Sequence, residues 1–243
     1  MKKIFINIAR KTLQKINFIK DFNLFKKLSD NRFKITWKER WECLSDKTQG
    51  TEFDRHYVLH PAWAARKLVE IKPDFHIDIS SSLHFCTIVS AFINVKFYDY
   101  RPASLNLSNL ESEHADITSL PFSENSIKSL SCMHVVEHIG LGRYGDPIDH
   151  AGDLKAISEL KRVLAPGGYL LFVVPVGKPK IQYNAHRIYS YDQIKNYFND
   201  LQLEEFSLIP DDCKDHKGII YNAKKQDADR QSYGCGCFLF KKE

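Results

Sequence analysis

Short apolar segments alternate with longer helical patterns through most of the chain. Strand-like runs lie at residues 75–79, 95–99, 127–133, 169–175, 203–209 and 235–241, and a further short element lies within 115–122. Residues 83–92, 153–164 and 191–198 place apolar side chains at helical spacing. This alternation predicts an α/β fold, a doubly wound and mostly parallel sheet with helices on both faces.

The beginning of the chain does not follow that alternation. Residues 1–27 predict an amphipathic helix with a stripe of apolar side chains, Phe5, Ile8, Ala9, Ile16 and Ile19. Residues 30–70 are rich in Trp, Arg and His, and Pro61 predicts the start of a second helix that ends at Ile71. We therefore expect two parts: residues 1–54, a basic helical extension or cap, and residues 55–243, the main domain.

Charge separates the same two parts. Residues 1–27 carry eight Lys or Arg and one Asp, a net charge of +7, so the remaining residues carry −2 of the total of +5. A main domain with that balance is not a nucleic-acid-binding body. The basic helix has three interpretations: it contacts an anionic membrane surface, it binds a partner, or it covers its own domain.

Other sequence features favour a reduced, cytoplasmic protein. Apolar stretches near the N-terminus are interrupted by Lys and Arg, unlike a secretory signal, and no apolar run is long enough to span a bilayer. The six cysteines are spread along the chain rather than clustered as in a disulfide scaffold. Four residues, Cys213, His216, Cys235 and Cys237, are zinc-type ligands, but their spacing is poor for a zinc site, and no metal site is predicted.

Acidic residues mark the ends of the first three predicted sheet segments. Asp78 precedes a turn of small residues, Ser80, Ser81 and Ser82, where backbone N–H groups can approach a ligand. Asp99 ends the second strand, where a carboxylate can accept hydrogen bonds from ribose hydroxyls. Asp116 and Ile117 can meet the edge and face of an adenine. These positions predict a site for an adenosyl group.

The fourth strand leads into the most polar loop of the chain, His134–Asp146. It holds two His, one Glu, one Asp, one Arg and three Gly. Ligands of open α/β sheets bind at the carboxyl ends of the strands, so this loop predicts the reaction site.

In this order the segments resemble the class I S-adenosylmethionine-dependent methyltransferases. The family's glycine-rich turn corresponds to Asp78-Ile-Ser-Ser-Ser-Leu83, and its adenine-side motif to Asp116-Ile-Thr-Ser-Leu-Pro-Phe122. Glu137-His138 and Leu160–Leu170 match two later motifs. The resemblance implies a Rossmann-like sheet with an antiparallel last strand and S-adenosyl-L-methionine as cofactor. The implied cofactor-binding residues are Asp78, Ser80, Ser81, Ser82, Asp99, Asp116, Ile117 and His134.

Three longer strings resemble one bacterial branch of that superfamily, which is little characterised and accompanies surface-polysaccharide genes. These strings are His134–Asp149, Pro175–Pro179 and Asn184-Ala-His-Arg187. The branch implies O-methylation of a sugar in glycan synthesis, by a protein in the cytoplasm or at the inner face of its membrane. One departure matters: Ser80 stands where the family usually has Gly, and serine lacks the conformational freedom of glycine.

A sugar hydroxyl is a poor nucleophile until a base takes its proton. His138 is the first candidate base, with Glu137 or Asp146 to orient it, and His186 is the second. The residues predicted to hold an anionic or sugar acceptor are Arg143, Tyr144, Asn184 and Arg187. A magnesium-dependent version, with Asp146, Asp149 and His150 as ligands, ranks below the metal-free one.

Two other functions compete with this one. The chain is a weak or inactive methyltransferase-like module that binds or regulates in a glycan-assembly complex, or it methylates nucleic acid. The carboxylates kept together at the strand ends favour an enzyme over a binding module, and the charge of the main domain disfavours nucleic acid. The sequence does not indicate the oligomeric state.

Overall fold

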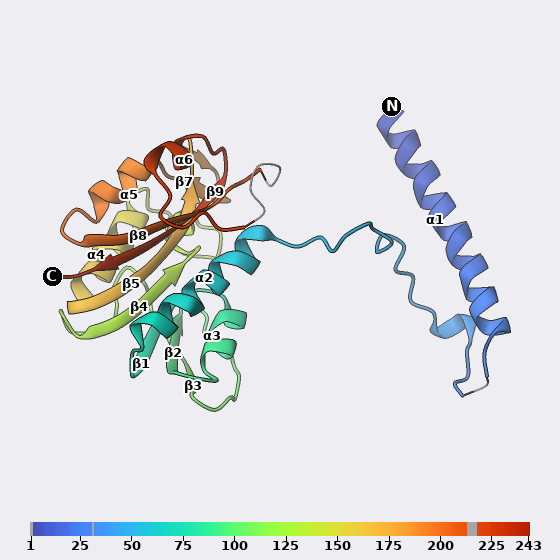
Figure 1. Cartoon of the computed structure of the whole chain (residues 1–243), viewed down its shortest axis with the longest axis horizontal. Coiled ribbons are helices and arrows are strands. Elements are labelled where there is room, and N and C mark those ends of the chain that lie inside the picture. The colour runs from blue at the N-terminus through green and yellow to red at the C-terminus, as the bar shows by residue number, and fades with distance from the viewer. Residues whose placement is uncertain (1, 31, 213–217) are drawn as a thin grey trace. The chain divides into compact units, whose positions relative to one another are not determined.

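The computed structural model describes residues 2–30, 32–212 and 218–243, with side chains from residue 6 onward. These residues form two compact units, Met1–Phe53 and Asp54–Glu243, which are drawn in Figure 1. None of the described helices is long and apolar enough to cross a bilayer.

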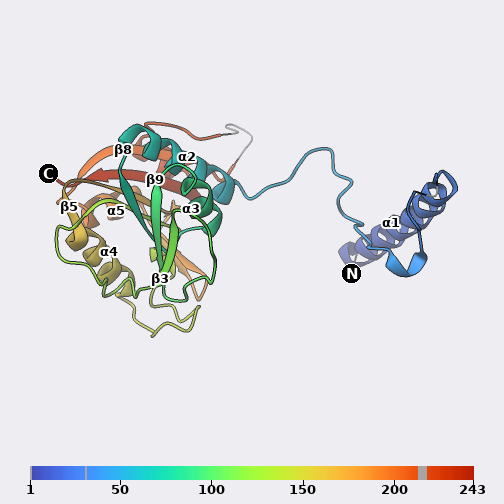
Figure 2. The ribbon, with the colours of Figure 1, turned by 90° about the horizontal axis from the view of Figure 1, so that it is seen from below.

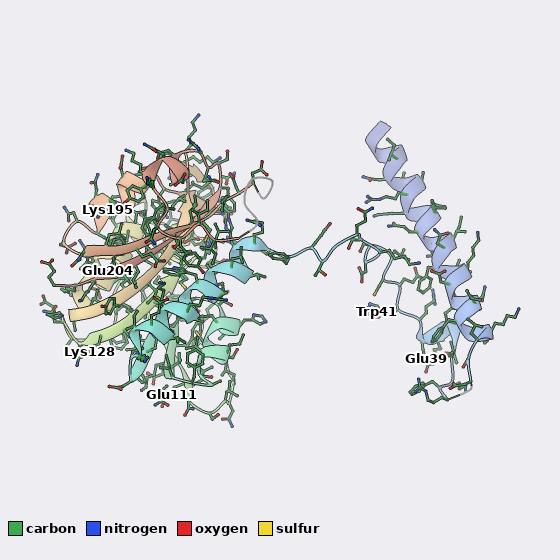
Figure 3. The ribbon with its side chains drawn as sticks, in the orientation of Figure 1. Glu39, Trp41, Glu111, Lys128, Lys195 and Glu204 are labelled. Atoms are coloured by element: carbon green, nitrogen blue, oxygen red, sulfur yellow. The ribbon has the colours of Figure 1, made fainter. Side chains whose placement is uncertain are left out.

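The N-terminal unit is built on helix α1 (Lys2–Lys27), followed by the short 3-10 helix η1 (Trp37–Glu39). The rings of Phe18 and Phe22 pack on Trp37, at centroid distances of 6.3 and 5.0 Å. Trp41, labelled in Figure 3, is exposed. Other apolar side chains of α1 are also exposed: Ile6, Ile8, Leu13, Ile16, Ile19, Leu24 and Phe25. The predicted helix is confirmed, and within this unit most of its apolar side chains are uncovered.

The C-terminal unit is a seven-stranded sheet in the order β3-β2-β1-β4-β5-β9-β8. The strands are β1 (Phe75–Ile79), β2 (Asn94–Asp99), β3 (Leu110–His114), β4 (Ile127–Met133), β5 (Leu164–Val176), β8 (Gln202–Ile209) and β9 (Gly234–Lys241). The neighbouring strands from β3 to β5 pair in parallel, and β9 runs antiparallel to both β5 and β8. This confirms the predicted sheet, including its antiparallel last strand.

Helices cover both faces of the sheet, as Figure 2 shows. On one face α2 (Arg55–Ile71) and α3 (Leu83–Val89) bury Trp63, Leu68 and Phe85 against the strands. On the other face α4 (Gly152–Val163), α5 (Tyr191–Tyr197) and α6 (Lys225–Asp229) close a second core. Because helices cover both faces, β4 and β5 are buried along most of their length. From Tyr169 onward β5 is a continuous apolar run, whereas β4 buries Ser129 and Ser131, whose hydroxyls bond His76.

Several predicted boundaries were wrong. Strand β5 begins at Leu164 rather than at Tyr169, and helix α3 ends at Val89 rather than at Phe92. Helix α2 begins at Arg55 rather than at Pro61, because the Asp54 side chain caps it by accepting the backbone N–H of Tyr57 at 3.1 Å. Pro61 lies inside the helix, where it has no backbone N–H to donate to the preceding turn. The third strand is Leu110–His114, upstream of the predicted element at 115–122. The sequence analysis also did not predict the hairpin of β6 (Lys180–Gln182) and β7 (His186–Ile188).

Candidate functional site

A pocket of about 320 Å³ lies at the carboxyl ends of the parallel strands. Its walls come from the segments that follow β1, β2, β3 and β4, together with Tyr57 of α2. Ten residues predicted from the sequence line it: Ser80, Ser81, Ser82, Asp99, Asp116, Ile117, His134, His138, Tyr144 and Asp146. The structure therefore brings the predicted cofactor turn and the predicted reaction loop to one cavity.

The turn after β1 is held tightly against the sheet. Ser80 has a φ of +57°, in the left-handed region that glycine adopts at little cost, and its N–H donates to the Tyr98 carbonyl at 2.8 Å. The Ser81 N–H donates to Asp78 Oδ1 at 2.9 Å. Asp78 itself is buried beneath the turn and does not line the pocket, and burial raises its pKa to about 6. Its role is to hold the turn in place.

The carboxylates of Asp99 and Asp116 both border the pocket. In Asp99, Oδ1 accepts the backbone N–H of Arg101 at 2.7 Å. In Asp116, Oδ1 accepts the backbone N–H and the hydroxyl of Thr118, at 2.8 and 2.7 Å. Among the residues that the structure describes, neither Oδ2 atom has a hydrogen-bond partner. Each carboxylate is thus fixed through one oxygen and keeps the other for a ligand.

The residues after β4, which include His134 and the 3-10 helix η2 (Val136–His138), form a buried acid–imidazole group. Glu137 Oε1 accepts Nδ1–H of His134 at 2.7 Å and lies 3.8 Å from Nε2 of His138. Burial raises the pKa of Glu137 to about 7 and lowers the pKa of His138. Nδ1–H of His138 donates to the Ala185 carbonyl at 2.6 Å, so its Nε2 carries the lone pair. His138 is therefore a neutral imidazole at the pocket wall, able to accept a proton.

Asp146 shapes the loop that follows. Its Oδ2 accepts the Gly140 N–H at 2.8 Å and its Oδ1 accepts the Tyr144 N–H at 3.2 Å, and within the described part of the chain it has no hydrogen bond or ion pair with His138. Gly140 has a φ of +79° and packs directly against the Asp149 backbone. Of the two groups predicted to orient His138, the geometry favours Glu137.

Several predicted residues lie outside the pocket. The Arg187 side chain is buried, donates to the Ile139 carbonyl at 2.7 Å and pairs with Asp153 at 3.4 Å, so it braces the reaction loop from behind rather than meeting an acceptor. His186 bonds Gln182 at 2.7 Å, and its ring lies 6.3 Å from that of His138. Asn184 is exposed. Arg143 is also exposed and bonds the Ala185 carbonyl at 3.0 Å, beside Tyr144.

The sequence analysis missed Tyr57 and Arg101 in the pocket wall. It also missed a buried group formed by His56, His134 and Cys235, the one set of metal-type ligands that meets among the described residues. The aromatic and histidine content of residues 30–70 was the available signal. The magnesium ligands considered from the sequence, Asp146, Asp149 and His150, do not form such a cluster in the described part of the chain. Asp149 instead pairs with Lys155 at 2.6 Å. Cys213 and His216 of the zinc alternative lie outside the described residues.

Comparisons with solved structures agree with the topology. One match, with 17% identity and a TM-score of 0.52, is a chain from the complex of the Haloferax volcanii Trm112 methyltransferase activator and a protein named as a methyltransferase; it covers 77% of this chain and 90% of that one. A second is the YcgJ protein of Bacillus subtilis, with 15% identity, a TM-score of 0.51 and coverages of 76% and 98%. A third, from Galdieria sulphuraria, is named as a sarcosine dimethylglycine methyltransferase, with 12% identity, a TM-score of 0.51 and coverages of 75% and 85%.

Sequence comparisons are less informative. A family model described as "Caenorhabditis protein of unknown function, DUF268" matches residues 93–207, just under half of the chain. No curated protein matches the sequence. The structural similarities, all at low identity, establish the fold: the C-terminal unit has the Rossmann-like fold of the class I S-adenosylmethionine-dependent methyltransferases.

Proposed function

We propose that this chain is an S-adenosylmethionine-dependent methyltransferase that transfers a methyl group to a hydroxyl of a sugar or glycan. The observation that carries the proposal is the pocket at the strand ends, where two carboxylates beside the left-handed turn at Ser80 each keep one oxygen without a partner among the described residues. The proposal that the acceptor belongs to surface-polysaccharide synthesis rests on the longer strings, such as His134–Asp149, that resemble the bacterial branch.

The residues present fit this cofactor. The free oxygen of Asp99 suits the ribose hydroxyls, since that strand end is the usual place for a ribose acid. Asp116 and Ile117 offer an acceptor and an apolar surface to an adenine. Ser80 takes the backbone conformation that glycine has in such turns, so the substitution leaves the turn intact. These features favour an open pocket that binds the cofactor over a pocket that the Ser80 side chain blocks.

The cofactor supplies an electrophilic methyl group on its sulfonium. The protein supplies a base and a place for the acceptor. His138 takes the hydroxyl proton on Nε2, and the Glu137 carboxylate 3.8 Å away stabilises the imidazolium that results. Neutral His138 is the competent form, and its lowered pKa keeps it neutral near pH 7.

One part of the pocket wall, at Tyr144 with two arginines beside its ring, suits a sugar acceptor. The Tyr144 ring lines the pocket, and the guanidinium groups of Arg101 and Arg143 lie 4.9 and 5.0 Å from its centroid. An aromatic face beside two cations suits a sugar ring that carries a phosphate or carboxylate.

We also propose that residues 1–27 bring the enzyme to the inner face of an anionic membrane. Exposed Ile8, Leu13, Ile16 and Leu24 share α1 with a large excess of Lys and Arg, a combination that favours anionic lipid surfaces. Sedimentation with phosphatidylglycerol vesicles, compared with phosphatidylcholine vesicles, tests this separately from catalysis. Equal binding to both would contradict it.

Formation of S-adenosylhomocysteine with a panel of nucleotide sugars and glycans tests the reaction. We expect His138→Gln to lower kcat by about 10²–10⁴-fold and to leave cofactor affinity unchanged, because only proton transfer is lost. His186→Gln is the matched control, with a smaller effect. Unchanged turnover in His138→Gln would exclude it as the base. Cofactor binding without turnover on any acceptor would favour the alternative, a methyltransferase-like binding module.

A further inference from the structure

Three buried side chains with metal-binding atoms meet next to the pocket. His56 comes from the first turn of α2, His134 is the first residue after β4, and Cys235 lies in β9. One ligand atom from each lies within 4.8 Å of the other two. None of the three is needed as an acid or base in the proposed reaction, so the cluster calls for a separate explanation.

The His134 imidazole is oriented as a metal ligand usually is. Nδ1–H of His134 donates to Glu137 at 2.7 Å, and its buried Nε2 has no partner among the described residues. His60 repeats this arrangement: Nδ1 bonds the His56 carbonyl at 2.6 Å, and its buried Nε2 has no partner among them either. A ring whose outer nitrogen donates to a carboxylate or carbonyl presents its other nitrogen to a metal.

Leaving these nitrogens unpartnered is costly. A buried polar atom without a hydrogen bond loses its interaction with water and gains none in the protein. His134 adds backbone strain, since its φ is +57°, a conformation that is unfavourable for a non-glycine residue and that clusters at functional sites. The His56 and His60 rings lie 5.4 and 5.0 Å from the His134 ring, so three imidazoles share one small volume.

We propose that His56, His134 and Cys235 bind one divalent transition metal ion of the zinc class. Two nitrogens and one sulfur are a ligand set that zinc accepts. In a tetrahedral site these atoms lie about 3.3–3.6 Å apart, so the present cluster, within 4.8 Å, closes by roughly one ångström on the ion. Cys235 binds as a thiolate and releases its proton to solvent. His60 lies outside this set of converging atoms, so the fourth position is left to a water molecule.

The ion would join three segments that are distant in the sequence. His134 lines the pocket, so the metal would fix one wall of it and hold the start of α2 and β9 to that wall. This inference does not rest on the proposed reaction, because the ligands meet whether or not the pocket binds S-adenosylmethionine.

The first test uses the full chain without a histidine tag. The protein is stripped with a chelator and titrated with Zn²⁺ and with Co²⁺ while absorption is followed. We expect one equivalent of either ion to bind, a thiolate-to-cobalt charge-transfer band in the near ultraviolet, and a higher Tm with Zn²⁺. Absence of any binding at micromolar metal would overturn the proposal.

Variants assign the ligands. Cys235→Ser removes the sulfur ligand and should lower Co²⁺ affinity by at least ~100-fold and abolish the charge-transfer band, since losing even an outer-shell partner costs about 10–100-fold. Cys237→Ser is the matched control, because that buried thiol lies 4.0 Å from Cys235 on the same strand but outside the ligand set. A band that survives Cys235→Ser, or that disappears in Cys237→Ser, would refute the assignment.

X-ray absorption of the zinc-loaded wild-type chain needs no variant and so does not depend on variant folding. We expect one sulfur at about 2.3 Å together with nitrogen ligands at about 2.0–2.1 Å. A shell of nitrogen and oxygen alone would contradict the site.

Discussion

Replacing Ser80 tests how the cofactor turn is built. Ser80 holds a φ of +57°, where a residue with a Cβ pays about 1–2 kcal/mol. Its hydroxyl also donates to the Tyr98 carbonyl at 3.2 Å, a long hydrogen bond. Ser80→Gly relieves the backbone strain and loses that bond, whereas Ser80→Ala loses the same bond and keeps the strain. The two variants therefore differ only in the Cβ.

The glycine variant also gains freedom in the unfolded chain, which costs about 0.5–1 kcal/mol. The net result is that Ser80→Gly should be more stable than Ser80→Ala by roughly 0.5–1 kcal/mol. In a domain of this size that difference corresponds to about 1–4 °C in Tm. Calorimetric unfolding of both variants measures it.

Cofactor titration of the same pair adds a functional readout. Because Ser80 already has the glycine-like conformation, we expect Ser80→Gly to bind S-adenosylmethionine at least as tightly as the wild type. A glycine variant that is less stable than the alanine variant would refute the assigned backbone conformation. A large gain in affinity on Ser80→Gly would show instead that the serine side chain obstructs the pocket.

Three further substitutions test the supports of the site. Gly140→Ala places a Cβ against a backbone carbonyl and should cost about 2–4 kcal/mol in urea unfolding, whereas Gly145→Ala, which has open space around it, should cost only about 1–2. Arg187→Met breaks a buried ion pair and should cost about 3–5 kcal/mol, against less than about 1 for exposed Arg143→Met; equal losses would contradict the bracing role. The pKa of Asp78 is about 6 in the folded chain and ordinarily 3.8, so the folded state binds more protons and stability falls as pH rises through this window. The wild type should lose about 1 kcal/mol relative to Asp78→Asn between pH 5 and 7, and parallel pH profiles would exclude this.

Burial on both faces explains which strands the sequence predicts well. β4 and β5 lie in the middle of the sheet, where the second half of β5 is an unbroken apolar run, and β4, although it holds two buried serines, was predicted with its observed boundaries. β3 is an edge strand with only Leu110 buried, so its sequence, Leu-Glu-Ser-Glu-His, carries no strand pattern. It becomes a strand because the folded chain places it beside β2, with which it pairs in parallel.

The site residues likewise divide into those that the strand pattern predicts and those whose position depends on tertiary packing. Asp99 and Asp116 both line the pocket because parallel strands present their carboxyl ends at one edge, an arrangement that the strand pattern of the sequence predicts. Arg187 resembles a substrate ligand in the sequence, and only the folded chain reveals that its donors are used on loop carbonyls and Asp153. The meeting of His56 with Cys235 likewise depends on how α2 packs against β9.

The most direct test of the central claim is calorimetric titration of the full chain with S-adenosylmethionine and with S-adenosylhomocysteine. The account predicts micromolar binding that Asp99→Ala weakens by about 10–100-fold, since a hydrogen bond to a charged group contributes about 1.5–3 kcal/mol. Asp200→Ala, which removes an exposed carboxylate paired with Lys161 away from the pocket, should bind like the wild type. No binding at millimolar ligand, or equal affinity in the wild type and Asp99→Ala, would contradict the assignment of this pocket.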